Sequence, residues 1–310
     1  MAFDFVMIVL GIGLLYTGGE GLVRGAMHLA RRLGLSPLVI GLTVVAFATS
    51  SPELAASLTA SLEGSPAIAI GNILGSNIAN VGLIRGAAAL IHPIVASRRL
   101  VRQEIPQMLF VCALVYPVFS DGLVSRFEGL LLLVFLAVLV FFQVRGGSEP
   151  AGAEVPAVDA PWSYPKSLVA VAVGIGLLVA GAHAMVTGAV DVARAFGISE
   201  RVIGLTLVAL GTSLPELASS LVAARRGESD LILGNIVGSN VFNVLCILGC
   251  TSLVGPIPVP PGSLGLDFWV MLGFSLLMIP LLSARFPPGR LRGLVFLALY
   301  AIYAGMLFAR

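Results

Sequence analysis

An internal repeat limits what this chain can fold into more than any other feature of its sequence. Residues 11 to 80 align without a gap onto residues 174 to 243, so that each residue has a twin 163 positions further on. From residue 41 the sequence reads GLTVVAFATSSPELAASL, and from residue 204 it reads GLTLVALGTSLPELASSL. From residues 71 and 234 it reads GNILGSNIAN and GNIVGSNVFN. A match this long indicates two copies of one structural unit.

The chain is too apolar to fold in water. Hydrophobic residues make up 58% of it and charged residues only 11%, so too little polar surface remains to cover a soluble core. Several apolar stretches are long enough to cross a bilayer as helices. We therefore expect an all-α integral membrane protein with ten transmembrane helices. The expected spans lie near residues 3–29, 37–62, 66–91, 104–120, 127–144, 166–193, 201–224, 230–254, 266–284 and 291–309.

The two copies are expected to be inverted in the membrane. Corresponding points are five spans apart, and because five is odd, the second copy enters the membrane in the opposite direction. We expect residues 1–144 to form the first five-helix repeat, residues 145–164 a short cytoplasmic linker, and residues 165–310 the second five-helix repeat. Folds of this kind place a site near the membrane midplane between broken helices, and switch access by moving one bundle against another.

The basic residues indicate how the chain sits in the membrane. Twelve fall in alternate loops on one side and four on the other, so the positive-inside rule predicts that both termini lie outside the cytoplasm. The net charge of +2 then reflects topology and gives no reason to expect nucleic acid as a partner. We expect a multi-pass protein of the plasma (inner) membrane that contacts lipid and functions as a monomer. The twelve are Arg31, Arg32, Arg98, Arg99, Arg102, Arg145, Lys166, Arg225, Arg226, Arg285, Arg290 and Arg292, and the four are Arg126, Arg194, Arg201 and Arg310.

Two glutamates lie halfway along apolar spans, Glu53 in TSSPE and Glu216 in TSLPE. A charge at that depth costs about 2.5 to 3.5 kcal/mol, so a partner is expected. The proline before each glutamate has no N–H, which frees the carbonyl four residues earlier, that of Ala48 or of Gly211. Such broken backbone persists at bilayer depth only where protein or a polar cavity satisfies it.

Hydroxyl and amide side chains surround each glutamate at helical spacing. A threonine and a serine lie four and three residues before it, on the same helix face, and the following span carries a serine and an asparagine four apart. All these donors are oxygen atoms, which suits a hard cation such as calcium and does not suit zinc or copper. The alternative is that these side chains only form hydrogen bonds between helices. The candidates are Thr49, Ser50, Ser76 and Asn80, with twins Thr212, Ser213, Ser239 and Asn243.

Four further asparagines are duplicated, and we expect them to satisfy helix ends and to stay outside the site. They are Asn72, Asn77, Asn235 and Asn240.

With these motifs the chain resembles the sodium/calcium exchanger branch of the calcium/cation antiporter superfamily, in its prokaryotic form. TSSPE with GNILGSNIAN, and TSLPE with GNIVGSNVFN, resemble its two alpha-repeats, and the resemblance covers nearly the whole chain. It implies a secondary active antiporter that exchanges sodium for calcium by alternating access. It implies no enzymatic activity and no cofactor, with calcium and sodium as the transported ions.

The resemblance also assigns roles to the candidate residues. It implies a central calcium site at Glu53 and Glu216, which would also serve sodium, and a sliding movement of the first and sixth spans. The remaining implied ligands are the backbone carbonyls of Thr49 and Thr212 at the calcium site, Ser50, Ser76, Ser213 and Ser239 with the carbonyls of Ala46 and Ala209 at flanking sodium sites, and Asn80 and Asn243 in the middle.

Asn80 and Asn243 depart from some relatives, which place an aspartate at one of these positions. Two carboxylates neutralise one calcium or two sodium ions, so a third sodium would leave a net positive charge. The coupling ratio and any potassium dependence stay open on this basis.

Other readings compete with sodium/calcium exchange. A proton/calcium antiporter could use the same glutamates, because buried carboxylates can release protons as cations bind. A cation channel would conduct without a counter-ion, although the inverted repeat weighs against it. An intramembrane enzyme is disfavoured because no His base or HExxH motif accompanies these segments.

Four features lie outside the motifs. Glu20 and Arg24 are spaced for an intrahelical pair, and the unmatched His183 could report pH or be structural. Arg85 is expected to snorkel to the membrane interface in preference to gating ions. The three cysteines lie inside expected spans, so neither a disulfide framework nor a zinc site is expected.

Overall fold

The computed structural model describes residues 2–146, 162–197, 209–259, 262–282 and 289–308, and these residues are almost entirely helical. Short π-helical turns, labelled η, interrupt several helices. The first half comprises α1 (Ala2–Leu33), α2 (Pro37–Ile40), η1 (Gly41–Val45), α3 (Ala46–Thr49), α4 (Ser51–Leu62), α5 (Pro66–Ala79), η2 (Asn80–Ile84), α6 (Arg85–Ile91), η3 (Leu100–Glu104), α7 (Ile105–Phe119), β1 (Leu123–Val124) and α8 (Arg126–Gly146). The second comprises α9 (Tyr164–Ala195), α11 (Ala209–Gly211), α12 (Leu214–Arg225), α13 (Ser229–Phe242), η5 (Asn243–Ile247), α14 (Leu248–Val254), β2 (Ile257–Pro258), α15 (Leu266–Leu282) and α16 (Arg290–Phe308).

The expected all-helical membrane fold is confirmed. Among the described residues, six helical segments are long and apolar enough to span a bilayer, and a bent pair, Pro37–Thr49 with Ser51–Leu62, makes a seventh. The three other expected spans fall on α7 and α15, which are shorter, and on residues 201–224, which lie partly outside the described residues. The count of ten spans therefore stays a prediction.

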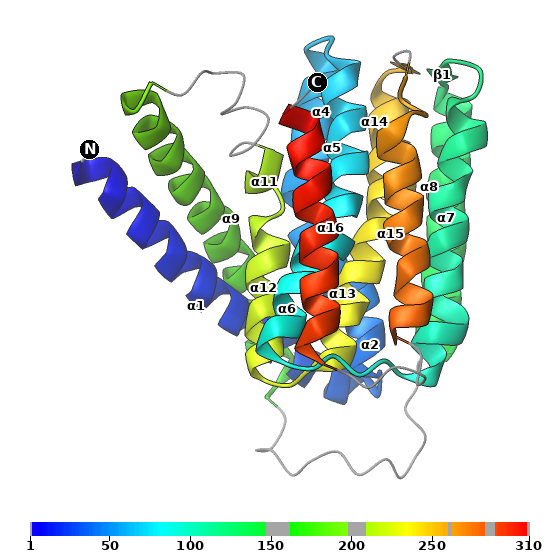
Figure 1. Cartoon of the computed structure of the whole chain (residues 1–310). Helices are drawn as coiled ribbons and strands as arrows, with labels where there is room; N and C mark the ends of the chain where they lie inside the picture. The colour runs from blue at the N-terminus through cyan, green and yellow to red at the C-terminus, as the bar shows by residue number, and fades with distance from the viewer. Residues whose placement is uncertain (1, 147–161, 198–208, 260–261, 283–288, 309–310) are drawn as a thin grey trace.

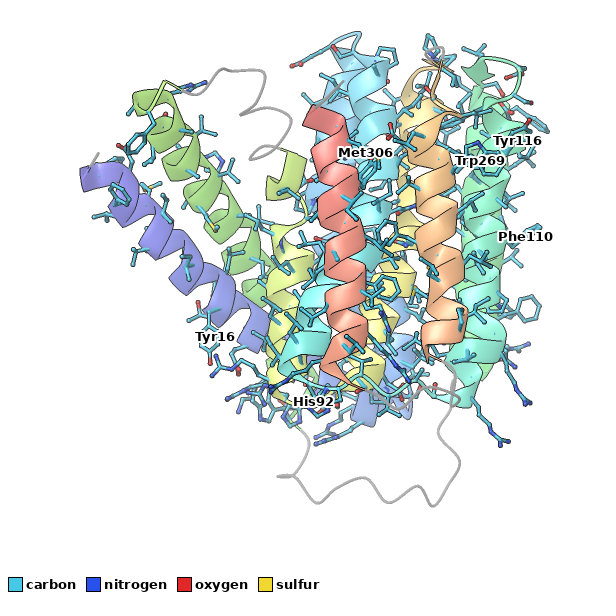
Figure 2. All side chains as sticks on the ribbon, in the orientation of Figure 1. Tyr16, His92, Phe110, Tyr116, Trp269 and Met306 are labelled. Atoms are coloured by element: carbon cyan, nitrogen blue, oxygen red, sulfur yellow. The ribbon has the colours of Figure 1, made fainter. Side chains whose placement is uncertain are left out.

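The outer surface of the bundle is apolar and the interior carries the polar groups. Figure 2 shows Tyr16, Phe110, Tyr116, Trp269 and Met306 pointing away from the helices. Each of these side chains is about half exposed, as suits contact with lipid. By contrast, serine, threonine, asparagine and glutamate side chains are buried near the centre. This inside-out distribution is the one that a bilayer favours.

Helices α1 and α9 form a tilted antiparallel pair along one side of the bundle (Figure 1). Glycines at seven-residue spacing line the contact in both helices, and they allow the backbones to approach closely. A Cβ atom on Gly18 would lie 2.8 Å from the carbonyl oxygen of Gly174, and one on Gly174 would lie 2.5 Å from the amide nitrogen of Leu22. We call this contact the glycine seam. Its glycines are Gly11, Gly18 and Gly25 in α1, and their twins Gly174, Gly181 and Gly188 in α9.

The two halves interlock in the remaining bundle. Helix α8 packs on α14, and in the equivalent arrangement α16 packs on α6. Helix α13 lies at the centre, because every residue in the most apolar window of its span is buried, against 22% for α8 and for α16. At one end, β1 pairs antiparallel with β2 and joins the halves again. The expected linker, residues 145–164, lies mostly outside the described residues.

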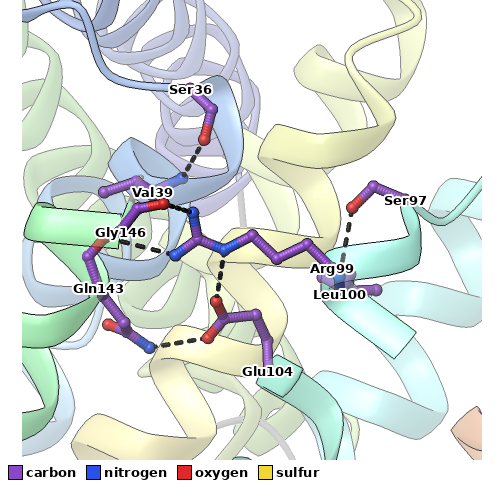
Figure 3. A network of polar contacts seen from close by, with 8 residues as sticks. All are labelled: Ser36, Val39, Ser97, Arg99, Leu100, Glu104, Gln143 and Gly146. Carbon is purple, nitrogen blue, oxygen red and sulfur yellow. Dashed lines mark hydrogen bonds and ion pairs between the residues drawn. The ribbon is translucent and has the colours of Figure 1, made fainter. Parts of the chain in front are cut away.

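A partly buried ion pair fixes η3, which precedes α7, to the end of α8 (Figure 3). Arg99 donates to one carboxylate oxygen of Glu104 over 3.0 Å, and Gln143 donates to the other, also over 3.0 Å. The guanidinium of Arg99 also donates to the carbonyls of Gln143 and Gly146 at the end of α8. Both oxygens of Glu104 are thus satisfied, as a structural buried charge requires.

Candidate cation site

The first motif breaks its helix at the position that the sequence predicts. Helix α3 ends at Thr49 and α4 begins at Ser51, with a 43° bend between the two segments. Ser50 lies at the break with φ −80° and ψ 4°, and Pro52 follows in the first turn of α4. In the second copy, Ser213 has nearly the same backbone angles, φ −91° and ψ 6°, between α11 and α12.

Each break supplies a serine to the glutamate of the other half. Ser50 donates from its hydroxyl to Oε1 of Glu216 over 3.0 Å, and Ser213 donates to Oε1 of Glu53 over 2.9 Å. Both glutamates are buried, with 1% and 2% exposure. The two breaks therefore build one shared site, and neither half holds its own glutamate in this way.

The second oxygen of each glutamate, Oε2, is buried and has no hydrogen-bond partner among the described residues. This contrasts with Glu104, whose two oxygens are both bonded. Leaving a buried acceptor unsatisfied is costly, and the cost is greater for a charged group. A cation that accepts these lone pairs would remove that cost.

The two middle asparagines also present free oxygens. Asn80 donates from Nδ2 to Oδ1 of Asn240 over 3.0 Å, and Asn243 donates to Oδ1 of Asn77 over 2.9 Å. Their own Oδ1 atoms are buried and have no partner among the described residues. Because each NH₂ group is already engaged, the amide is held with its acceptor available. Asn80 and Asn243 each begin a π-helical turn, η2 and η5, a distortion that is frequent at functional sites.

Ser76 and Ser239 have the same place in the two copies but different contacts. Ser76 lies 3.4 Å from Ser213, hydroxyl to hydroxyl, which joins it to the group around Glu53. The hydroxyl of Ser239 is buried without a partner among the described residues. The orphaned oxygens thus come from five side chains of the predicted set: Glu53, Glu216, Asn80, Asn243 and Ser239.

The backbone positions of the predicted set lie at the same helix ends. Ala46 begins α3, and its carbonyl accepts the amide of Ser50 over 3.0 Å and the hydroxyl of Thr49 over 3.5 Å. Ala209 begins α11 at the edge of the described residues. Thr49 ends α3, next to the break, and Thr212 lies beside Ser213.

Sequence reasoning missed the support given by the other duplicated asparagines. Asn72 donates to the backbone carbonyl of Glu53 over 3.1 Å and accepts from the hydroxyl of Thr212 over 3.4 Å. Asn235 accepts from the hydroxyl of Thr49 over 3.2 Å. Together with Asn77 and Asn240, these residues hold ligand candidates across the two halves instead of satisfying helix ends. Their duplication at the same offset was the available signal.

The donor set fits a hard cation. It combines two carboxylates with neutral amide and hydroxyl oxygens, which is the chemistry that calcium and sodium accept. Among the described residues there is no group of three or more His, Cys, Asp and Glu side chains that could hold a metal ion. Cys112, Cys246 and Cys250 are free thiols.

Two features outside the motifs differ from expectation. Arg85 does not snorkel, because its side chain is only 1% exposed and its guanidinium stacks on the ring of Phe296 at 4.1 Å. The Glu20 carboxylate pairs with Arg24 over 3.0 Å as expected, but it also accepts from Arg226 at the end of α12. His183 lies exposed on α9.

A buried, all-oxygen site shared by two broken helices in a multi-pass bundle defines a cation transporter. Comparison with known proteins agrees. The sequence model of the family described as "Sodium/calcium exchanger protein" matches residues 3–145 and 166–309. The chain belongs to the sodium/calcium exchanger family.

Individual relatives match over nearly their full length. The inner membrane protein YrbG of Escherichia coli (strain K12) is 36% identical over 97% of this chain and 96% of its own. The sodium/calcium exchanger MaX1 of Methanosarcina acetivorans is 32% identical over 98% of both. A solved structure of the sodium-calcium exchanger NCX_Mj, soaked with Na⁺ and Sr²⁺, superposes with a TM-score of 0.85 at 36% identity and covers 97% of both chains.

Proposed function

We propose that this chain exchanges sodium for calcium across the membrane by alternating access to the site at Glu53 and Glu216. The observation that carries the proposal is the crossed pair of hydrogen bonds, Ser50 to Glu216 and Ser213 to Glu53. This crossing leaves one free oxygen on each carboxylate at the junction of the two halves. The membrane bundle and the family support the same conclusion.

We assign calcium to the two glutamates with the backbone carbonyls of Thr49 and Thr212. Sodium occupies the same carboxylates and flanking positions at Ser50 with Ser76 and at Ser213 with Ser239, together with the carbonyls of Ala46 and Ala209. Asn80 and Asn243 line the middle. The orphaned oxygens of Glu53, Glu216, Asn80, Asn243 and Ser239 support this assignment.

The charge of the site explains why the flux is coupled. An empty site holds two buried carboxylates, and closing protein around uncompensated charge is strongly unfavourable. One calcium or two sodium ions neutralise it. The loaded forms can therefore cross the closed state, whereas the empty form is held back, and this produces exchange instead of leak.

Helices α1 and α9 move as one unit in this scheme. The glycine seam joins their backbones at four levels, and α12 is the neighbour on which both helices pack. Sliding of the pair past the site would switch access from one side of the membrane to the other.

Residues 1–144 and 165–310 act as the two inverted repeats, in a monomer of the plasma (inner) membrane with both termini outside. The N-terminal end of α1 and the C-terminal end of α16 lie at the same end of the bundle (Figure 1), which supports placing both termini on one side of the membrane. The charge distribution between loops is the reason for choosing the outside.

The test is calcium uptake into vesicles that contain the purified protein. An outward sodium gradient should drive uptake, and Glu53→Gln or Glu216→Gln should abolish it, because each removes one of two charges that balance calcium. Glu63→Gln is the matched control, since Glu63 is an exposed carboxylate at the end of the same helix α4. Near-normal sodium-driven flux in either site variant would contradict the assignment.

Other gradients distinguish the alternatives in the same vesicles. Equal uptake under a pH gradient without sodium would identify a proton/calcium antiporter. Uptake that needs no counter-ion would identify a channel.

A further inference from the structure

Two arginines meet where α6 packs on α16, away from the cation site. Arg85 immediately precedes Gly86, and Arg292 immediately precedes Gly293. At these glycines the backbones nearly touch, because a Cβ atom on Gly293 would lie 2.7 Å from the carbonyl oxygen of Gly86. The two guanidinium groups are therefore anchored on adjacent turns of facing helices.

The guanidinium groups lack partners for several of their N–H groups. Nε and Nη1 of Arg85, and Nε and Nη2 of Arg292, are buried without a hydrogen-bond partner among the described residues. The ring of Phe296 lies against the face of the Arg85 guanidinium at 4.1 Å. Stacking satisfies the face of a guanidinium but not the N–H donors at its edge. The two guanidinium groups together have four buried donor nitrogens without an acceptor in the described part of the chain. An anion with several acceptor oxygens would satisfy them.

The fold does not itself require an arginine at this place. The twin of Arg85 is Leu248, which is fully buried in α14 where α14 packs on α8. The equivalent contact in the other half is thus built with an apolar side chain. A buried arginine that the packing does not need, and that lacks a carboxylate partner among the described residues, indicates a ligand.

We propose that Arg85 and Arg292 form a binding site for a phosphate group. Arginine presents N–H donors in a fork that matches two phosphate oxygens, and two forks at one place suit a tetrahedral anion. Arg292 is in the first turn of α16, and Arg85 lies six residues, about 9 Å, before the end of α6. Figure 1 shows these helix ends at the same end of the bundle. Because this is the end of two expected spans, the phosphate comes either from a lipid headgroup or from inorganic phosphate in solution.

The experiment measures both sources on the full-length protein. Delipidated protein in a neutral detergent is titrated with inorganic phosphate, against chloride at the same ionic strength, and thermal unfolding is followed. In parallel, native mass spectrometry measures the retention of phosphatidylglycerol from mixed micelles. We expect binding in at least one arm, weakened about tenfold or more in Arg85→Leu and in Arg292→Gln.

Arg102→Gln is the matched control, because Arg102 is an exposed arginine in η3 whose loss removes the same charge. It should bind as the unaltered protein does. The leucine in Arg85→Leu reproduces the side chain of the twin position, Leu248. If Arg85→Leu does not fold, the binding measured with Arg292→Gln decides the test. No binding in either arm, or equal weakening by all three substitutions, would overturn the proposal.

Discussion

At the scale of single residues, the site depends on which atom each side chain leaves free. Serine hydroxyls occupy Oε1 of both glutamates, and asparagine acceptors occupy the NH₂ groups of Asn80 and Asn243. The remaining oxygens have no partner among the described residues. In the proposed site, each of these four hydrogen bonds therefore holds a side chain with its second oxygen left for the ion.

Ser213→Ala should weaken sodium binding. It removes the donor to Glu53 and the hydroxyl near Ser76, and a hydrogen bond to a charged group contributes about 1.5 to 3 kcal/mol. The sodium concentration for half-maximal calcium flux should therefore rise about tenfold or more. Ser51→Ala is the control, because Ser51 donates its hydroxyl to the backbone carbonyl of Phe47 and not to a glutamate. An unchanged sodium dependence in Ser213→Ala would remove this serine from the site.

Glu228 allows a test of pH-dependent stability outside the spans. Burial raises the pKa of its carboxyl and Asp230 adds to this, whereas Arg31 and Arg226 oppose it without cancelling it. The folded protein thus favours the protonated form, so its contribution to stability is present below the usual carboxyl pKa and is lost as pH rises through the raised one. Glu228→Gln should be more thermostable than the unaltered protein at pH 8, and the difference should vanish near pH 4.

The measurement is the thermal unfolding temperature in detergent across this pH range. Glu63→Gln is the matched control, since it removes the carboxyl of an exposed glutamate. A gain that is the same at pH 4 and pH 8 would show that the carboxyl of Glu228 does not titrate in the way described.

At the scale of elements, helices α1 and α9 are held together by backbone contact. At each glycine of the seam the nearest atoms of the other helix include a backbone carbonyl or amide atom, and side chains take part mostly through their Cβ or Cγ atoms. Such a surface is smooth and repeats every two turns, which suits a pair that stays together while it shifts against the core.

Gly174→Ala should disrupt this pair. The added methyl group would lie 2.5 Å from the amide nitrogen of Leu22, so the helices must separate, at a cost of about 1 to 3 kcal/mol. Gly176→Ala, two residues along the same helix, meets nothing within 4 Å and should leave stability equal or slightly raised. Thermal unfolding of the two variants in detergent makes the comparison. Equal melting temperatures of the two variants would show that the close contact at Gly174 does not stabilise the helix pair.

At the scale of the whole molecule, the two halves contact each other both through packed helices and through the glutamate site. Helix α8 packs on α14 and α16 on α6, while each half completes the glutamate site of the other. Neither half is complete alone, although each is one copy of the same sequence unit.

The orientation of the whole chain gives a further prediction. Alkaline phosphatase, which is active only outside the cytoplasm, should be active when fused after Arg310 and inactive when fused after Gly146. The charge distribution between loops is the physical reason. Fluorescence of green fluorescent protein at the same two positions should show the opposite pattern. Alkaline phosphatase activity in the fusion after Gly146 would show that the topology is the reverse of the predicted one.

Much of this protein could be predicted from its sequence because the information is local or duplicated. Apolar stretches predict membrane helices, and the prolines after Ser51 and Leu214 predict breaks beside the glutamates. The oxygen-only chemistry follows from residue types within one or two helical turns. The duplication then identifies the same positions twice.

Tertiary structure alone decided which groups meet. Ser50 and Glu216 are far apart in sequence, as are Asn80 and Asn240, and no periodicity within a helix relates them. The burial of Arg85 likewise depends on α16, a helix from the other half. Sequence determined the membrane fold and the kinds of atoms at the site, because backbone breaks and side-chain chemistry are local. Only the packing of the two halves determined which oxygens stay free, because the hydrogen bonds that engage the others cross between the halves.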